Sequence, residues 1–143
     1  MANYKPYIIS DDLIFISGQL PIIDNKIIFS GKIEKELSIE NSRKAILLST
    51  FNLLNVLCVA IEDNELDGTN IKVLNIKGYL NTEPSFKNHS KLFNEASDLL
   101  VDILGEKNGA HSRSVIGVNS LPLDSPVEID GIFSILDHNE ERN

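Results

Sequence analysis

Arg113 is the first candidate for chemistry, because it stands at the start of the apolar stretch HSRSVIGVNSLP, residues 111–122. The chain has only 13 Lys and Arg residues against 21 Asp and Glu residues. A guanidinium keeps its proton and offers a planar fork that matches a carboxylate, which lysine does not. Arg113 is therefore a candidate clamp for a carboxylate ligand. The alternative is a solvated charge or half of a surface ion pair, which is commoner at a strand end.

Two carboxylates, Glu128 and Asp130, alternate with Val127 and Ile129 in a second apolar stretch near the C-terminus. Alternation in a strand places both carboxylates on the face opposite the apolar side chains. A partly desolvated carboxyl group holds a proton closer to neutral pH and can orient or activate a water molecule. Either residue fits this role, and a wet sheet face is the alternative for both.

Several other polar residues carry weaker signals. Tyr7 and Ser17 lie on otherwise apolar strands. A tyrosine in such a strand is more often an interface or core residue than a ligand-binding one. Gly18 indicates a bulge or a close backbone approach. Asn94 falls within a helical pattern and is ordinarily an exposed helix residue.

Metal and thiol chemistry find little support in the sequence. The three histidines show no ligand spacing with one another or with carboxylates, so we predict no metal site. A Ser/His/Asp triad has no nucleophile elbow to support it. Cys58 is the single cysteine, so an intrachain disulfide is impossible, and its apolar surroundings predict an inert core residue.

Length and charge limit the function classes. A chain of 143 residues with 42% apolar residues predicts one domain over residues 1–143, with a frayed tail at 137–143. A net charge of −8 opposes nucleic-acid binding. The apolar run at residues 46–61 is interrupted by polar residues, so no membrane span is expected. Without a visible secretory signal, the cytoplasm is the expected compartment.

The elements that must position these residues follow from periodicity and turn signals. We expect a three-stranded meander in residues 7–29, a largely buried helix capped by Ser38, and a second helix over 85–104 that ends at Gly105. Strands are expected at 71–80, 112–121 and 127–136. This order predicts a two-layer α+β sandwich, with about six strands in a mixed sheet and both helices on one face. The opposite face then meets water or another copy of the protein.

A hairpin formed by residues 113–135 would separate the two main candidates. If the chain turns near Leu123 and Asp124, Arg113 and Glu128 lie roughly 20 Å apart along the ladder. A pocket that contains both would then require a neighbouring subunit. We therefore expect a forced monomer to be inactive.

Together, SGQLP at residues 17–21, FNEASDLL at 93–100, HSRSVIGVNSLP and VEIDGIF resemble the Rid proteins, also called the YjgF or liver perchloric-acid-soluble protein family. The long second helix is similar to that of a longer-chain subgroup. The resemblance implies a chorismate-mutase-like fold and a homotrimer with clefts between subunits. Some members carry the older label of endoribonuclease or translation inhibitor, which the charge of this chain disfavours.

The same resemblance implies an activity and a set of residues. Active Rid enzymes hydrolyse 2-imino or 2-enamino acids to ammonia and a 2-keto acid, without a cofactor. Arg113 matches the arginine that grips the substrate carboxylate, and Glu128 matches the residue that orients water. The matching pocket positions are Tyr7, Ser17, Gly18, Asn94 and Val115, the last replacing a cysteine found in shorter members. A non-catalytic trimer that binds small carboxylates is the alternative function.

Overall fold

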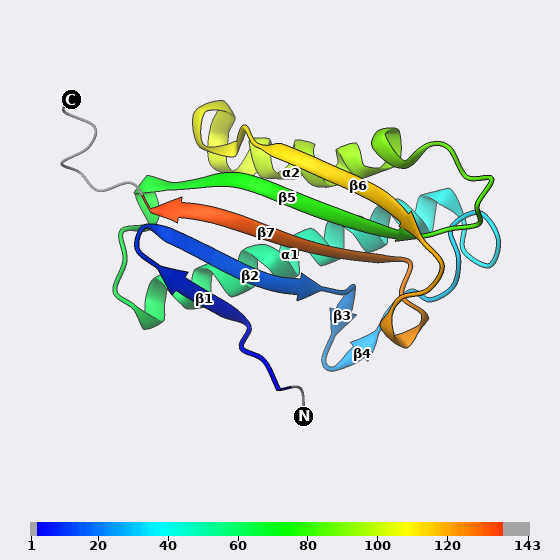
Figure 1. Ribbon diagram of the computed structural model, residues 1–143, viewed down its shortest axis with the longest axis horizontal. Helices are drawn as coiled ribbons and strands as arrows, with labels where there is room; N and C mark the ends of the chain where they lie inside the picture. Colours follow the sequence, from blue (N-terminus) through cyan, green and yellow to red (C-terminus); the bar gives the residue numbers. More distant parts are fainter. Residues whose placement is uncertain (1–2, 136–143) are drawn as a thin grey trace.

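A five-stranded mixed sheet forms one layer of the molecule, and two helices form the other (Figure 1). The computed structural model describes residues 3–135; the predicted frayed tail lies outside them. The strand order is β1-β2-β7-β5-β6. The bounds are β1 Tyr7–Ser10, β2 Leu13–Gln19, β5 Ile71–Asn81, β6 Ser112–Val118 and β7 Val127–Ile135, with helices α1 Ile39–Asp63 and α2 His89–Gly109. The predicted two-layer α+β architecture is confirmed.

The N-terminal meander was predicted wrongly, and the main sheet has five strands rather than about six. β1 and β2 pair as expected, but β3 (Ile22–Ile23) and β4 (Lys26–Ile27) form a separate small hairpin. Asp24 and Asn25 both have positive φ, 51° and 64°, which is typical of a tight two-residue hairpin turn. Pro21 precedes this turn, so the chain leaves the sheet before a third strand can pair.

The predicted hairpin of residues 113–135 does not form. β6 pairs in parallel with β5, whereas β7 lies between β2 and β5 and is antiparallel to both. A 3-10 turn at Pro122–Asp124 begins the connection that carries the chain past β5 (Figure 1). The central position satisfies the backbone of β7 on both edges and buries Val127, Ile129 and Phe133.

α1 begins as predicted, whereas α2 departs from the prediction at both ends. Ser38 caps α1 as predicted, and its hydroxyl accepts a hydrogen bond from the Asn41 backbone N–H at 3.1 Å. α2 begins at His89 rather than at residue 85, because a turn follows Pro84. Gly105 has φ +82° and interrupts α2, but helical structure continues to Gly109.

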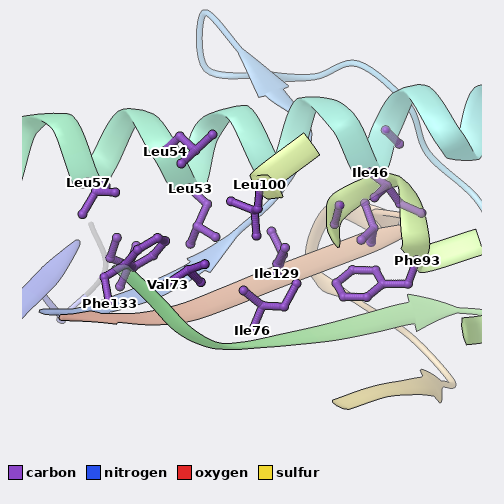
Figure 2. Packing of buried hydrophobic residues seen from close by; sticks show 14 of the residues in the cluster. Ile46, Leu53, Leu54, Leu57, Val73, Ile76, Phe93, Leu100, Ile129 and Phe133 are labelled. Carbon is purple, nitrogen blue, oxygen red and sulfur yellow. The ribbon is translucent and has the colours of Figure 1, made fainter. Parts of the chain in front are cut away.

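The core lies between the layers (Figure 2). Side chains of α1 and α2 meet residues of β5 and β7 there; those labelled are Ile46, Leu53, Leu54, Leu57, Val73, Ile76, Phe93, Leu100, Ile129 and Phe133. A β-carbon at Gly78 would lie 2.5 Å from the Phe93 ring, so glycine lets α2 approach β5. α1 is long and apolar enough to span a membrane by length and composition, but its packing on the sheet makes it a core helix.

The outward face of α1 differs from prediction. The helix was expected to be largely buried, but Phe51 and Val59 are exposed on it. Cys58 is exposed on α1, so its assignment to the core was wrong. The sheet face opposite the helices carries the exposed side chains of Ile8, Phe15 and Ile116. Ile8, Phe15 and Ile132 are neighbours in one cross-strand row on this face. No described element covers it (Figure 1).

Candidate ligand site

Arg113 lies in the edge strand β6 and points into the space between the sheet and α2. Its β5 neighbour is Ile76, a core residue on the same face. The Nη1 group donates to the Ser97 hydroxyl oxygen at 3.1 Å, and Nη2 donates to the Ser90 carbonyl at 3.0 Å. The guanidinium carbon lies 5.6 Å from the centre of the Phe93 ring, a cation–π contact. The side chain is half-buried and held in one orientation.

No carboxylate among residues 3–135 pairs with Arg113. The ion pairs in this part of the chain join Lys35 to Glu83, Arg43 to Glu95 and Lys44 to Glu40. Both protein acceptors of Arg113 are neutral, and its three other N–H groups have no acceptor among the described residues. Among the described residues this arginine is therefore not half of an ion pair, and three of its N–H groups are open to solvent or to a ligand.

On the α2 side, a row of three polar residues forms the site, and only one of them was predicted from the sequence. Ser90, Asn94 and Ser97 are spaced four and three residues apart, which puts them on one helix face. Asn94 is exposed on this helix face, between the two serines that accept hydrogen bonds from Arg113. Its neighbours Ser90 and Ser97 were not predicted, although their helical spacing around Asn94 was a usable signal.

Val115 and His111 extend the same side of β6. Val115 is partly buried and packs against the core. The sequence predicts no role for His111, but its Nε2 lies 2.9 Å from the Ser97 hydroxyl and its Nδ1 lies 2.6 Å from the Gly109 carbonyl. Residues two apart in a strand lie on the same face, so the sequence could have predicted that His111 and Arg113 belong to one site.

A cavity of about 380 Å³ lies between the start of α2 and the end of β6, and Arg113 is not among its lining residues. Its lining includes Thr82, Glu83, Phe86, His89 and Gly117. His89 is the residue before Ser90, whose carbonyl binds Arg113. We call Arg113, Asn94 and Ser97 the arginine half-site.

Glu128 lies on the opposite face of the sheet. Its neighbours Val127 and Ile129 are buried under the helices, so its side chain points away from them. A β-carbon at Gly18 would lie 2.7 Å from the Glu128 carboxyl carbon, so this glycine allows the side chain to lie against β2. Burial, and to a smaller extent the charge of Asp130, raises the pKa of Glu128.

Asp130 is engaged by another group. Its carboxylate accepts a hydrogen bond from the Tyr79 hydroxyl at 3.2 Å. Burial raises the pKa of Tyr79, and the Asp130 charge and hydrogen bond add to this. Glu128 has no such partner among the described residues, which favours Glu128 over Asp130 for handling water.

Ser17 and Gly18 complete the glutamate side. They lie where the β2–β7 register shifts, between Ile16 and Gln19, so the predicted bulge is present. The Ser17 hydroxyl donates to the Lys5 carbonyl at 2.7 Å. Both residues line a cavity of about 730 Å³ beside α1 and the small hairpin. Glu128 does not line this cavity. We call Glu128, Gly18 and Ser17 the glutamate half-site.

Tyr7 is distant from Arg113 in the same chain. Its hydroxyl lies 3.4 Å from an Asp63 carboxylate oxygen and accepts from the Asn64 side chain at 3.2 Å. One cross-strand row runs from Tyr7 through Ile16, Gly131 and Ile76 to Arg113, at opposite sheet edges. Four strand spacings of about 4.8 Å separate their backbones by roughly 19 Å.

The predicted separation of Arg113 and Glu128 along a hairpin was also wrong. Their β5 neighbours are Ile76 and Tyr79, so they differ by three residues along the strands and two strands across. That gives roughly 14 Å between their backbones at standard spacings. The two side chains nevertheless point to opposite faces. One chain therefore presents two separate half-sites.

This chain is similar to known proteins in both sequence and fold. The family model described as "YjgF/chorismate mutase-like, putative endoribonuclease" matches residues 1–134. The chain belongs to this YjgF/Rid family. Protein TCP17 of Trypanosoma cruzi is 30% identical over 134 residues, which cover 94% of this chain and 82% of TCP17. The chorismate-mutase-like fold is thereby confirmed.

Solved structures place the chain within the YjgF/Rid fold. Protein Atu1372 of Agrobacterium tumefaciens, of unknown function, has a TM-score of 0.87 and 34% identity, with 94% of this chain and 83% of that one covered. TdcF of E. coli, solved with bound serine, has a TM-score of 0.65 and 17% identity, with 96% and 91% covered. These similarities establish the fold and family, and the reaction must be argued from the site.

Proposed function

We propose that this YjgF/Rid protein is a hydrolytic deaminase of reactive 2-imino or 2-enamino acids. The observation that carries the proposal is Arg113, which is half-buried, held by neutral acceptors and not paired with any described carboxylate. A guanidinium so held binds a carboxylate by charge-assisted hydrogen bonds. The bound serine of TdcF, also an α-carboxylate, supports a ligand of this class.

Glu128 supplies the water chemistry in this proposal. Its raised pKa lets the carboxyl group exchange a proton with water nearer to neutral pH. Attack of an oriented water on the C=N carbon gives a carbinolamine, which then releases ammonia and leaves a 2-keto acid. Because such imines hydrolyse unaided, positioning by Arg113 and Glu128 suffices.

We further propose a homotrimer in which the arginine half-site of one chain meets the glutamate half-site of its neighbour. Opposite faces of one sheet cannot share a ligand within a chain. The uncovered sheet face with Ile8, Phe15 and Ile116 offers an apolar surface for this assembly. A head-to-tail contact of two different half-sites closes into a ring, and three copies form three sites. We place the trimer in the cytoplasm.

The alternative function is a non-catalytic trimer that binds small carboxylates. The separation of Arg113 and Glu128 on opposite faces of the sheet favours this alternative, because carboxylate binding needs Arg113 but not Glu128. Imine generated in situ by an amino-acid oxidase separates the two functions. Faster ammonia release than in buffer, lost in Arg113→Ala, supports the deaminase. Binding of 2-ketobutyrate without any acceleration supports the alternative.

A further inference from the structure

A chain of three hydrogen bonds begins at the Arg113 guanidinium. Arg113 Nη1 lies 3.1 Å from the Ser97 hydroxyl oxygen, which lies 2.9 Å from His111 Nε2. His111 Nδ1 lies 2.6 Å from the Gly109 carbonyl oxygen. These contacts connect the end of α2 with the start of β6.

The chemistry of the groups sets the direction of the two outer bonds. The Gly109 carbonyl can only accept, so Nδ1 of His111 carries a proton. A guanidinium can only donate, so the Ser97 oxygen accepts from Arg113. The Ser97 oxygen has a second lone pair, so Nε2 of His111 can either accept the hydroxyl proton or donate to the oxygen. When Nε2 accepts, the ring is the Nδ1–H tautomer and the Ser97 hydroxyl bridges Arg113 and His111.

Gly109 fixes the far end of this chain. A β-carbon at position 109 would lie 2.7 Å from the Val101 Cα and 2.8 Å from the Leu100 carbonyl oxygen. The residue is buried and packs directly on the α2 backbone. The Gly109 carbonyl is therefore a fixed acceptor, and it holds the His111 ring in one orientation.

We propose that His111 is a positioning residue for Arg113 and acts through Ser97. The inference rests on the proposed role of Arg113 as the carboxylate clamp. A lone serine hydroxyl on a helix rotates and can turn its proton to the carbonyl four residues earlier. The acceptor on His111 removes that freedom and turns a Ser97 lone pair toward Nη1. The guanidinium then presents its three remaining N–H groups to the ligand in a fixed orientation.

A Ser–His contact of this length also fits a nucleophile and its base. The positioning role differs in a measurable way, because it forms no covalent bond at Ser97. Intact-mass measurement after treatment with a fluorophosphonate and with an activated ester should show no adduct on Ser97. A Ser97 adduct that forms in the wild-type protein and not in His111→Phe would overturn the positioning role.

Ligand binding by the full-length protein tests this positioning of Arg113 by His111 through Ser97, which we call the relay. Calorimetric titration with 2-ketobutyrate should show affinity falling about tenfold in Ser97→Ala and about fivefold in His111→Phe. His111→Gln, which restores an acceptor for the hydroxyl, should recover most of the loss. The double variant Ser97→Ala/His111→Phe should match Ser97→Ala within about twofold. Losses that multiply in the double variant would overturn the relay. Ser120→Ala, an exposed serine beyond the end of β6, is the matched control.

The histidine tautomer gives a test that needs neither ligand nor turnover. In protein labelled with ¹⁵N-histidine, the signals of His111 are distinguished from those of the other two histidines by their loss in His111→Gln. His111 should show a protonated Nδ1 and an unprotonated Nε2 at neutral pH. The Nε2–H tautomer would overturn the relay. If wild-type protein binds neither 2-ketobutyrate nor benzoate, the proposed function fails, and the tautomer still decides the relay.

Discussion

Arg113 and Glu128 point to opposite faces of one sheet, with Ile76 and Tyr79 as their respective neighbours on β5. The two residues that carry the proposed reaction therefore cannot reach one ligand within a chain. In the proposed trimer, each subunit provides one half of two different sites. This relationship leads to a complementation experiment.

Mixed assembly of two inactive variants should restore activity. Arg113→Ala and Glu128→Gln are each expected to be inactive, but a mixed trimer contains some interfaces with both intact half-sites. Random assembly from equal amounts makes about a quarter of the interfaces intact, so about a quarter of the wild-type rate should return after co-refolding. Ammonia release measures it. A rate no higher than that of either variant alone would show that the site lies within one chain.

Removal of the guanidinium should abolish turnover with little effect on folding. We expect Arg113→Ala to lower kcat/KM at least about 100-fold, because the substrate carboxylate loses its charge-assisted donors. Arg113→Lys should recover little, since an ammonium lacks the planar fork. The free energy of unfolding should fall by about 1 kcal/mol, as neutral hydrogen bonds are lost. Arg43→Ala, which breaks an exposed pair with Glu95, is the matched control and should keep full activity.

Glu128 should make stability depend on pH. Burial raises its folded-state pKa above the ordinary value of 4.5, so folding disfavours its charged form. The wild-type protein should therefore lose stability as pH rises from the ordinary pKa through the raised one. Glu128→Gln has no such group, so its Tm relative to wild type should rise across this window. A Tm difference between the two proteins that is constant with pH would contradict the assignment.

The contact between Gly18 and Glu128 should appear as coupling between substitutions. Gly18→Ala places a methyl group against the Glu128 side chain, and we expect a loss of about 1–2 kcal/mol in unfolding free energy. The loss should largely disappear in a Glu128→Ala background, where the methyl group has space. Urea unfolding of the four proteins in this cycle measures the coupling. Equal losses in both backgrounds would place the strain elsewhere.

Charge on the uncovered sheet face should dissociate the proposed trimer. Ile8→Asp with Phe15→Asp puts two carboxylates in one exposed apolar row, which an interface would desolvate. We expect a folded monomer by analytical ultracentrifugation and less than about a hundredth of the wild-type turnover. A trimer of unchanged stability would exclude this face from the interface.

The main elements were predictable because their signals are local. Ser38 caps α1, and the apolar periodicity of both helices and the β-branched run of β5 needed no tertiary information. The small hairpin, the exposed Cys58 and the place of β7 were not predictable in this way. Strand order depends on which edges and faces become buried together, and one strand's pattern does not specify its partner.

Sequence by itself determined the family and the two-layer architecture and made Arg113 a candidate site residue, because residue types and their order along the chain carry those signals. Only the tertiary structure decided what surrounds Arg113. It shows neutral acceptors from Ser90 and Ser97 in place of a carboxylate, and it brings His111 to Ser97. It also puts Glu128 on the other face of the sheet. Such relationships arise from parallel pairing of β6 with β5 and from helix packing, which join residues far apart in the chain.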